Sequence, residues 1–317
     1  MKRPFIIAEV GSNWKNFGHA KDSIQAAKVA GANAVKFQLF THEELYGVPG
    51  KMDGELPAEW LPQLKEKADA AGIEFMCSAF SVAGVEIVNQ YVSRHKLASP
   101  ENNHLDLIDA MIESDKPLIY SCGGSGLADI GKTLSYIEQK HGIGLEITLL
   151  YCVSAYPCRS HNLFNIEKLK KFGYKVGLSD HSLDIIHTPV SAAYYHEIEV
   201  LEKHFKLEGI EGTPDAGHSL SAGQFKLMVD RLGIDPTDDK TTYRSTEEYD
   251  AVTKYNRRAI VTAPIGKGQV LKNGENFGYF RSLKEDVNGL GPGFPLNGKI
   301  SSKDLALGDS IGPQDFQ

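Results

Sequence analysis

Two histidines, His181 and His204, each follow a short apolar run that is typical of a buried parallel strand. The runs lie within KVGLSDHS (175–182) and EVLEKHF (199–205), and a segment long enough for one helix separates them. Adjacent parallel strands lie about 4.8 Å apart, so the two imidazoles could bind one divalent metal ion from neighbouring strand ends. Two imidazoles with open coordination positions suit an ion that also holds substrate and water. The alternative is that each histidine only forms a hydrogen bond where its strand ends.

Two lysines, Lys36 and Lys96, stand inside predicted strands, where a charge is costly to bury unless it is paired or used. Lys36 and Gln38 are two residues apart and therefore project from one face of their strand. A lysine in such a place binds an anionic substrate or forms a structural ion pair with a carboxylate such as Glu9. A Schiff-base aldolase would also carry a lysine at a strand end, but it would not need the paired histidines.

Hydroxyl, amide and carboxyl groups cluster where the predicted strands end. These groups are Glu9, Ser78, Ser99, Glu101, Asn102, Ser121, Ser154, Tyr156, Ser179 and Asp180. Hydroxyls and lysines donate hydrogen bonds to phosphate, so the whole set describes a pocket for a small anionic molecule.

The elements that must position these groups alternate along the first two-thirds of the chain. Strand candidates span 5–11, 34–40, 74–80, 95–99, 117–123, 146–153, 175–179 and 199–205, with helix-like segments at 22–30, 60–71, 105–114 and 130–141. Eight strands alternating with helices over about 230 residues predict an α/β protein with a (β/α)8 TIM barrel, whose catalytic groups lie at the carboxyl ends of the strands. A doubly wound open sheet is the alternative, but residues 11–14 lack the glycine spacing of a dinucleotide-binding loop.

The last 80 residues have a different character. Residues 236–255 are polar and are interpreted as a linker after a barrel of residues 1–235. Residues 256–317 consist of short strand-like runs separated by glycine turns, which predicts a small β-rich domain. A domain of this size has little core of its own, so we expect it to dock on a barrel.

Composition excludes several classes of protein. The net charge of −7 argues against a nucleic-acid-binding surface. The sequence contains no apolar run of about 18 residues, so no membrane span is predicted. The four cysteines, at 77, 122, 152 and 158, form no CxxC pair, and the first three lie in or beside predicted strands. They indicate core residues in a reducing cytoplasm rather than disulfides or zinc ligands.

These motifs resemble those of the sialic acid synthase family, which includes the bacterial N-acetylneuraminate, legionaminate and pseudaminate synthases and the spore-coat polysaccharide synthases. The resemblance rests on FIIAEVGSN at the start, VKFQ, HKLASPENN, GLSDHS, LEKHF and the terminal SIGPQDF, and it covers nearly the whole chain. The order of these motifs makes the resemblance specific, and the family identifies the C-terminal piece as an antifreeze-like (SAF) domain.

The resemblance implies a transferase that condenses phosphoenolpyruvate with an N-acetylmannosamine-type sugar. The enol C–O bond is cleaved, phosphate leaves, and a nine-carbon 2-keto acid forms. His181 and His204 would hold Mn²⁺ or Mg²⁺, which would polarise the aldehyde of the open-chain sugar. The residues implied to bind phosphoenolpyruvate are Lys36, Ser78, Lys96, Ser99, Ser121 and Ser179.

The resemblance also implies the side of the pocket that faces the sugar. Glu9 and Asp215 would bind sugar hydroxyls, and Glu101 would act as an acid/base near the attacking water. Further implied substrate contacts are Gln38, Asn102, Ser154, Tyr156 and Asp180. Arg281 would reach the sugar from the small domain of a partner subunit, which implies a domain-swapped homodimer.

Several positions depart from the family pattern, and they leave the acceptor sugar open. Trp14, Tyr151 and Ser154 replace other residue types, Ser-Leu follows Arg281, and the segment 41–58 is short. The histidines at 187, 196 and 218 are interpreted as capping, packing or facing solvent. A metal hydrolase, a Schiff-base aldolase and a non-catalytic sugar-binding relative remain as alternative functions.

Overall fold

The computed structural model describes residues 3–233, 257–281 and 289–317, and the chain divides into two compact units, Met1–Asp235 and Pro236–Gln317. The predicted linker at 236–255 lies outside the described residues. Each unit is described by itself below. Within the described residues, no helix is both long and apolar enough to cross a membrane.

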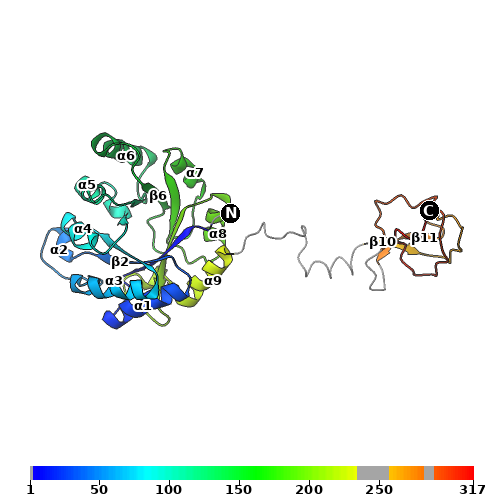
Figure 1. The fold of residues 1–317 in the computed structure, drawn as a ribbon, viewed down its shortest axis with the longest axis horizontal. Coiled ribbons are helices and arrows are strands. Elements are labelled where there is room, and N and C mark those ends of the chain that lie inside the picture. Colours follow the sequence, from blue (N-terminus) through cyan, green and yellow to red (C-terminus); the bar gives the residue numbers. More distant parts are fainter. Residues whose placement is uncertain (1–2, 234–256, 282–288) are drawn as a thin grey trace. The chain divides into compact units, whose positions relative to one another are not determined.

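The first unit is built around eight parallel strands curled into a barrel (Figure 1). The strands are β1 (Phe5–Gly11), β2 (Ala34–Leu39), β3 (Glu74–Ala79), β4 (His95–Leu97), β5 (Leu118–Ser121), β6 (Ile147–Cys152), β7 (Lys175–Asp180) and β8 (Val200–Lys206). Their order is β3-β2-β1-β8-β7-β6-β5-β4. The first strand of the barrel, β1, therefore pairs with the last, β8. In the described residues β3 and β4 are in contact but share no hydrogen-bonded ladder, so the barrel is nearly closed. The predicted barrel and its eight strands are confirmed.

Helices surround the strands on the outside (Figure 1). They are α1 (Phe17–Val29), α2 (His42–Tyr46), α3 (Leu61–Ala71), α4 (Val82–Asn89), α5 (Leu105–Glu113), α6 (Leu127–His141), α7 (Phe164–Lys170), α8 (His187–Tyr195) and α9 (Ala222–Leu232). The first helix was predicted to begin at Asp22, but α1 begins at Phe17. The reason is that the side chain of Asn16 accepts a hydrogen bond from the His19 amide and caps the helix there.

Two apolar layers hold the barrel together. An outer layer packs residues such as Ile6, Ala8 and Val10 of β1 against the helices. An inner cluster fills the barrel with one residue from each of six strands. Its members are Ile7, Ala34, Met76, Ile119, Leu150 and Val200. Side chains two residues apart on a strand point to the same face. The next inward-facing position on each strand therefore lies one layer closer to the carboxyl ends of the strands than this inner cluster.

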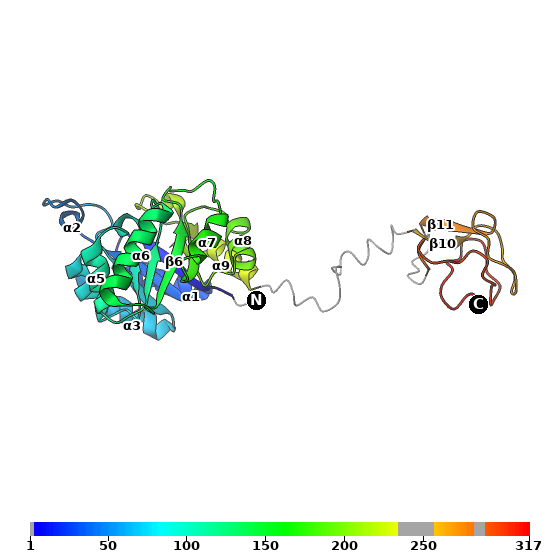
Figure 2. The ribbon, with the colours of Figure 1, turned by 90° about the horizontal axis from the view of Figure 1, so that it is seen from above.

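The segment between β2 and α3 contains α2, which stands apart from the other helices in Figure 2. Thr41 and Glu44 form a reciprocal capping box at the start of α2, and Gly47 ends it in the left-handed conformation. The segment returns to the barrel near Gly54, where a side chain would collide with Ser12. Helix α2 is therefore capped at both ends, and the segment packs closely on the barrel at Gly54.

The second unit contains the antiparallel pair β10 (Arg257–Val261) and β11 (Phe277–Arg281). Isolated bridges, including Ile265 to Leu305 and Val270 to Ile300, join its remaining short extended runs. Its core is a separate apolar cluster. The fully buried members include Ala259, Leu271, Phe277, Leu296 and Ile311.

Candidate functional site

A cavity of about 370 Å³ opens at the carboxyl ends of the barrel strands. Its position follows from the inner apolar cluster, because lining residues on five strands stand two residues beyond a member of that cluster. On β5, Ser121 follows Ile119. Glu9 follows Ile7 on β1, Lys36 follows Ala34 on β2, and Glu202 follows Val200 on β8. Ser78 stands in the same relation to Met76 on β3. Strand periodicity alone therefore places polar groups of distant sequence in one cavity.

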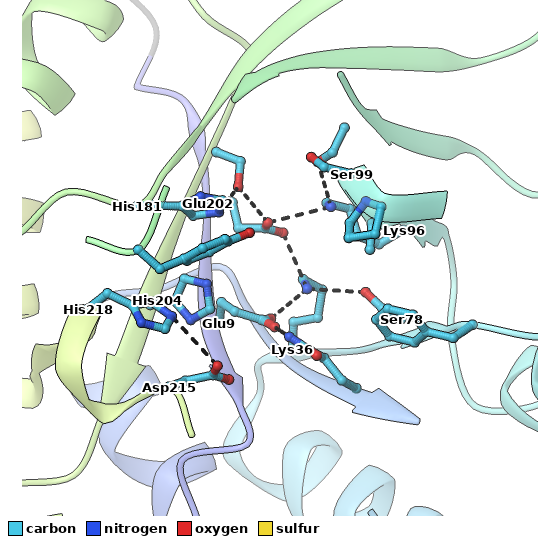
Figure 3. A pocket seen from close by; sticks show the side chains of 17 residues that line it. Glu9, Lys36, Ser78, Lys96, Ser99, His181, Glu202, His204, Asp215 and His218 are labelled. Atoms are coloured by element: carbon cyan, nitrogen blue, oxygen red, sulfur yellow. Dashed lines mark hydrogen bonds and ion pairs between the residues drawn. The ribbon is translucent and has the colours of Figure 1, made fainter. Parts of the chain in front are cut away.

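Four buried charged groups form the floor of the cavity (Figure 3). Lys36 Nζ lies 2.6 Å from Glu9 Oε2 and 3.6 Å from Glu202 Oε2. Lys96 Nζ lies 3.5 Å from Glu202 Oε1. Glu202 therefore bridges the two lysines, and each of these four side chains is almost completely buried.

Serine hydroxyls surround the charged groups. Lys36 Nζ donates to Ser78 Oγ at 3.2 Å, and Lys96 Nζ donates to Ser121 Oγ at 2.7 Å. Ser179 Oγ donates to Glu202 Oε1 at 2.9 Å. Two ammonium groups and several hydroxyls that converge in this way suit the oxygens of a phosphate or carboxylate group.

Burial and neighbouring charges shift the pKa values of Glu9 and Glu202 in opposite directions. Burial raises the pKa of Glu9 to about 7, although the positive charge of Lys36 opposes the rise. Burial also disfavours the ionised form of Glu202, but Lys36 and Lys96 outweigh it and lower the pKa of Glu202 to about 2. At neutral pH the cavity thus holds a firmly ionised Glu202, while Glu9 can exchange a proton.

Three imidazoles line the other side of the cavity (Figure 3). The ring centroids of His181 and His204 are 5.4 Å apart, and those of His204 and His218 are 4.4 Å apart. The Tyr156 ring stacks on His181 at 4.2 Å and meets His218 at 4.9 Å. Burial lowers the pKa of His181 to about 4 and lowers the pKa values of His204 and His218 as well. The rings are therefore neutral at neutral pH, which is the form that binds metals.

The donor set on this side fits a divalent metal ion. Potential ligand atoms of His204, Asp215 and His218 all lie within 4.8 Å of one another. His204 Nδ1 and His218 Nε2 are buried and have no hydrogen-bond partner among the residues that the structure describes. Imidazole nitrogens and a carboxylate oxygen are common ligands of divalent transition metals. His181, a predicted ligand, lies beside this cluster.

Most of the residues selected from the sequence line the cavity. These are Glu9, Lys36, Gln38, Ser78, Lys96, Ser99, Ser121, Tyr156, Ser179, His181, His204 and Asp215. Gln38 donates to Glu9 Oε1 at 2.6 Å, and Ser12 N donates to Asp215 Oδ2 at 2.8 Å.

Asp180 is not among the lining residues, because alternation along β7 turns it away from Ser179. Its carboxylate lies 2.6 Å from Lys203 Nζ and 3.0 Å from His161 Nε2, with both ion pairs buried. Asp180 therefore forms a buried ion pair with Lys203 on the outer side of the strand, and its predicted contact with substrate stays a prediction that the lining of the cavity does not support.

Four further selected residues are not among the lining residues of the cavity. Glu101 Oε2 lies 3.3 Å from His104 Nδ1, and Asn102 Nδ2 donates to Gly123 O at 2.9 Å. Both belong to the short turn after β4, whose direction the sequence pattern does not determine. Ser154 is exposed on the loop after β6. Arg281 stands in β11 of the second unit.

Trp14, one of the departures from the family pattern, has well-defined contacts. Its ring packs edge-to-face on Trp60 at 5.1 Å, and its Nε1 donates to Gly11 O at 3.2 Å. Trp14 is not among the lining residues of the cavity. Its role in the described residues is to anchor the start of α1 against α3.

Sequence reasoning missed two polar lining residues, Glu202 and His218. Glu202 is two residues before His204, and strand alternation could have placed both in the cavity. His218 is three residues after Asp215, where a 3₁₀ turn (Ala216–His218) brings the two side chains together. His218 was interpreted as capping, packing or facing solvent; it does pack, on Tyr156 and His204, and it also lines the cavity.

Comparison with known proteins gives a consistent result. The NeuB family model matches residues 23–234. A pseudaminic acid synthase of Campylobacter jejuni is 30% identical over all of this chain and 97% of its own length. A diacetyllegionaminic acid synthase of Legionella pneumophila is 28% identical over 91% of this chain and 85% of its own.

A solved structure agrees with the sequence comparison. The N-acetylneuraminic acid synthetase of Leptospira borgpetersenii superposes with a TM-score of 0.69 and 26% identity, over 79% of this chain and 90% of that one. Since the family model spans most of the barrel and the Campylobacter relative spans the entire sequence, this chain belongs to the NeuB family.

Proposed function

We propose that this chain condenses phosphoenolpyruvate with an N-acetylmannosamine-type sugar to form a nine-carbon 2-keto acid. The observation that carries the proposal is the convergence of two buried lysines and several serine hydroxyls on one cavity. Relatives named pseudaminic, legionaminic and N-acetylneuraminic acid synthases support it. The names differ in the sugar acid, so the acceptor is proposed as a class.

In this proposal the lysine side of the cavity binds phosphoenolpyruvate. Lys36 and Lys96 offset the negative charge of its phosphate and carboxylate groups. Serine hydroxyls donate the remaining hydrogen bonds. The serines concerned are Ser78, Ser99, Ser121 and Ser179.

The proposed reaction joins C3 of the enol to the aldehyde carbon of the open-chain sugar. Positive charge then develops at C2, water adds there, and the C–O bond to phosphate breaks so that phosphate leaves. The ionised Glu202 would offset the charge at C2, and Glu9, whose pKa is about 7, would hold or release a proton. Glu101 was expected in this role, but its carboxylate lies beside His104 rather than in the lining.

The histidine side of the cavity would receive the sugar. A divalent ion such as Mn²⁺ or Mg²⁺, held by His204 with His181, would supply Lewis acidity toward the aldehyde oxygen when bound. Gln38, Tyr156 and Asp215 line this side and offer hydrogen bonds to sugar hydroxyls.

The whole molecule extends the proposal beyond the barrel. We assign the second unit as an antifreeze-like (SAF) domain in a cytoplasmic enzyme. Arg281 of this domain would complete the sugar site of a partner subunit in a domain-swapped homodimer.

A Schiff-base aldolase is the second candidate, because burial lowers the pKa of Lys96 and a neutral amine is the required nucleophile. Borohydride reduction in the presence of pyruvate distinguishes the two functions. An aldolase would carry a reduced adduct on Lys96, whereas the proposed synthase forms no covalent bond to lysine.

The experiment that tests the proposal measures phosphate release from phosphoenolpyruvate with Mn²⁺ and a panel of sugars. The panel contains N-acetylmannosamine, its 6-phosphate and diacetylated relatives. We expect release with one sugar only, and loss of release on adding a chelator. Lys96→Ala should abolish release, whereas Lys175→Ala, on the exposed surface, should not. Binding of phosphoenolpyruvate without release for any sugar would contradict the proposal.

A further inference from the structure

We propose that His218 is a direct metal ligand, and that it completes a site of two imidazoles and one carboxylate with His204 and Asp215. The proposal deepens the proposed function and rests on it for the presence of a divalent ion in this cavity. It keeps His204 from the predicted pair of His181 and His204, adds His218, and assigns Asp215 to the metal rather than to sugar hydroxyls. It also names the class of ion that the site prefers.

The spacing of the three side chains supports the assignment. Their candidate ligand atoms lie within 4.8 Å of one another. Two atoms bound to one transition-metal ion at about 2.1 Å can be at most about 4.2 Å apart. Small side-chain rotations therefore bring all three atoms to bonding distance. The His204 and His218 rings cross at 76°, so neither ring blocks the other from the ion.

Two buried nitrogen atoms point to a missing partner. His204 Nδ1 and His218 Nε2 have no hydrogen-bond partner, although these side chains are 7% and 8% exposed. An unsatisfied polar group in such a place costs about 1–3 kcal/mol. A cation bound among these side chains would supply a partner for a buried nitrogen of this kind.

Asp215 is oriented by its own partner. Ser12 N donates to Asp215 Oδ2 at 2.8 Å, which leaves Oδ1 on the side of His218, 3.6 Å from its Nε2. Outer hydrogen bonds of this kind hold metal-ligating carboxylates in place. The 3₁₀ turn at Ala216–His218 fixes the spacing, because side chains three residues apart eclipse in such a turn.

His181 differs from His218 in its partners. His181 Nδ1 lies 2.9 Å from Val153 O, and its Nε2 lies 3.4 Å from Ser179 Oγ. Both nitrogens of His181 thus have polar neighbours within the protein. His218 Nε2 has no hydrogen-bond partner among the described residues, and its ion-pair neighbour at 3.6 Å is Asp215 Oδ1, which is itself a proposed ligand.

The ligand set predicts which ion binds. Imidazole nitrogen favours later divalent metals, in the order from Mn²⁺ through Co²⁺ toward Zn²⁺, whereas Mg²⁺ prefers oxygen ligands. A second close imidazole should therefore raise the affinity for Co²⁺ much more than the affinity for Mg²⁺.

The test measures metal binding by the full-length protein without substrates. Chelator-treated protein is titrated with Co²⁺ and with Mg²⁺, by calorimetry and by the visible absorption of bound Co²⁺. We expect His218→Ala to weaken Co²⁺ binding by about 10–100-fold and to change the Co²⁺ spectrum. Binding of Mg²⁺ should change far less. His187→Ala, an exposed histidine of α8, is the matched control and should bind like wild type.

A second variant, His218→Gln, keeps the size of the side chain and guards against a folding defect in the alanine variant. Unchanged Co²⁺ affinity and spectrum in both variants would overturn the proposal. So would a changed pH profile of turnover without any change in Co²⁺ binding, because His218 would then act with Asp215 in proton transfer.

The outcome is separable from the proposed function. Loss of Co²⁺ binding in His218→Ala would support the ligand even if no sugar gave phosphate release. Conversely, phosphate release together with Co²⁺ binding that does not change in the His218 variants would support the synthase function and contradict the assignment of His218 as a ligand.

Discussion

Glu202 is the single negative charge that the two cavity lysines share. It lies 3.6 Å from Lys36 and 3.5 Å from Lys96, and those charges keep it ionised. In the free protein this carboxylate therefore competes with an anionic substrate for the same ammonium groups. Neutralising Glu202 should therefore affect the binding of phosphoenolpyruvate and the rate of phosphate release in opposite directions.

We predict that Glu202→Gln binds phosphoenolpyruvate at least as tightly as wild type, because the cavity gains one net positive charge. Turnover should fall by about 10²-fold or more, because the carboxylate that offsets charge at C2 is lost. Steady-state phosphate release and direct binding of phosphoenolpyruvate measure the two effects. Glu146→Gln, on an exposed surface, serves as control. Weaker binding with unchanged turnover would contradict the assigned role.

Asp180 tests the opposite case, a buried charge with a structural role. We predict that Asp180→Asn lowers the free energy of unfolding by about 3–5 kcal/mol, because it leaves Lys203 buried without its carboxylate. Urea denaturation at pH 7 measures the loss, with Asp230→Asn of an exposed pair as control. A stable variant with a raised KM would instead return Asp180 to the substrate site.

The same pair has a predictable pH dependence. Burial favours the neutral form of Asp180, but its hydrogen bond to His161 and the charge of Lys203 outweigh burial and lower its pKa below 3.8. The folded pKa is then below the unfolded one, so the stabilisation is present above pH 3.8 and is lost as pH falls. The stability difference between wild type and Asp180→Asn should therefore shrink below this pH.

Strands β7 and β8 carry much of the site. β8 alone turns Glu202 and His204 inward and Lys203 outward, and β7 places Ser179 beside Glu202. Their close approach depends on Gly177, where an added Cβ would lie 2.4 Å from Val200 O and 2.5 Å from Leu150 Cδ2.

We predict that Gly177→Ala separates β7 from β8 and destabilises the first unit by about 1–3 kcal/mol. Phosphate release should fall as well, because Ser179 and Glu202 would move apart. Urea denaturation and the phosphate assay measure these effects. Gly217→Ala is the stability control, because the new Cβ there would meet no described residue within 4 Å apart from its chain neighbours. Equal stability of Gly177→Ala and wild type would show that the strands adjust without cost.

The two units of the molecule raise the question of how many chains build one site. Arg281 lies in the second unit, whereas the cavity lies wholly in the first. The proposed exchange of domains between subunits can be tested by complementation.

We predict that Arg281→Ala and Lys96→Ala, each inactive as full-length chains, regain activity when they are unfolded and refolded together. A mixed dimer with exchanged domains has one site in which both the barrel and the arginine are intact. An equal mixture should reach about a quarter of wild-type activity, since half of the dimers are mixed. Continued inactivity of the refolded mixture would contradict the exchange. Separately purified chains that are mixed without refolding are the control.

The sequence by itself determined the barrel, the side of the barrel that carries the chemistry, and most of the cavity. These follow from local rules: strands repeat every two residues, helices cover parallel strands, and a lysine within a strand must be paired or used. Lys36, Lys96, His181 and His204 were found in this way, because each is placed by the strand that carries it.

Only the tertiary structure decided the positions that depend on turns and on neighbouring strands. His218 enters the cavity through one 3₁₀ turn, Glu101 leaves it through another, and Trp14 packs on Trp60 because α1 meets α3. Glu202 acquires its role from lysines that are far away in the sequence. Local patterns determine the face on which a strand residue lies, but turn direction and long-range pairing arise only when the whole barrel is packed.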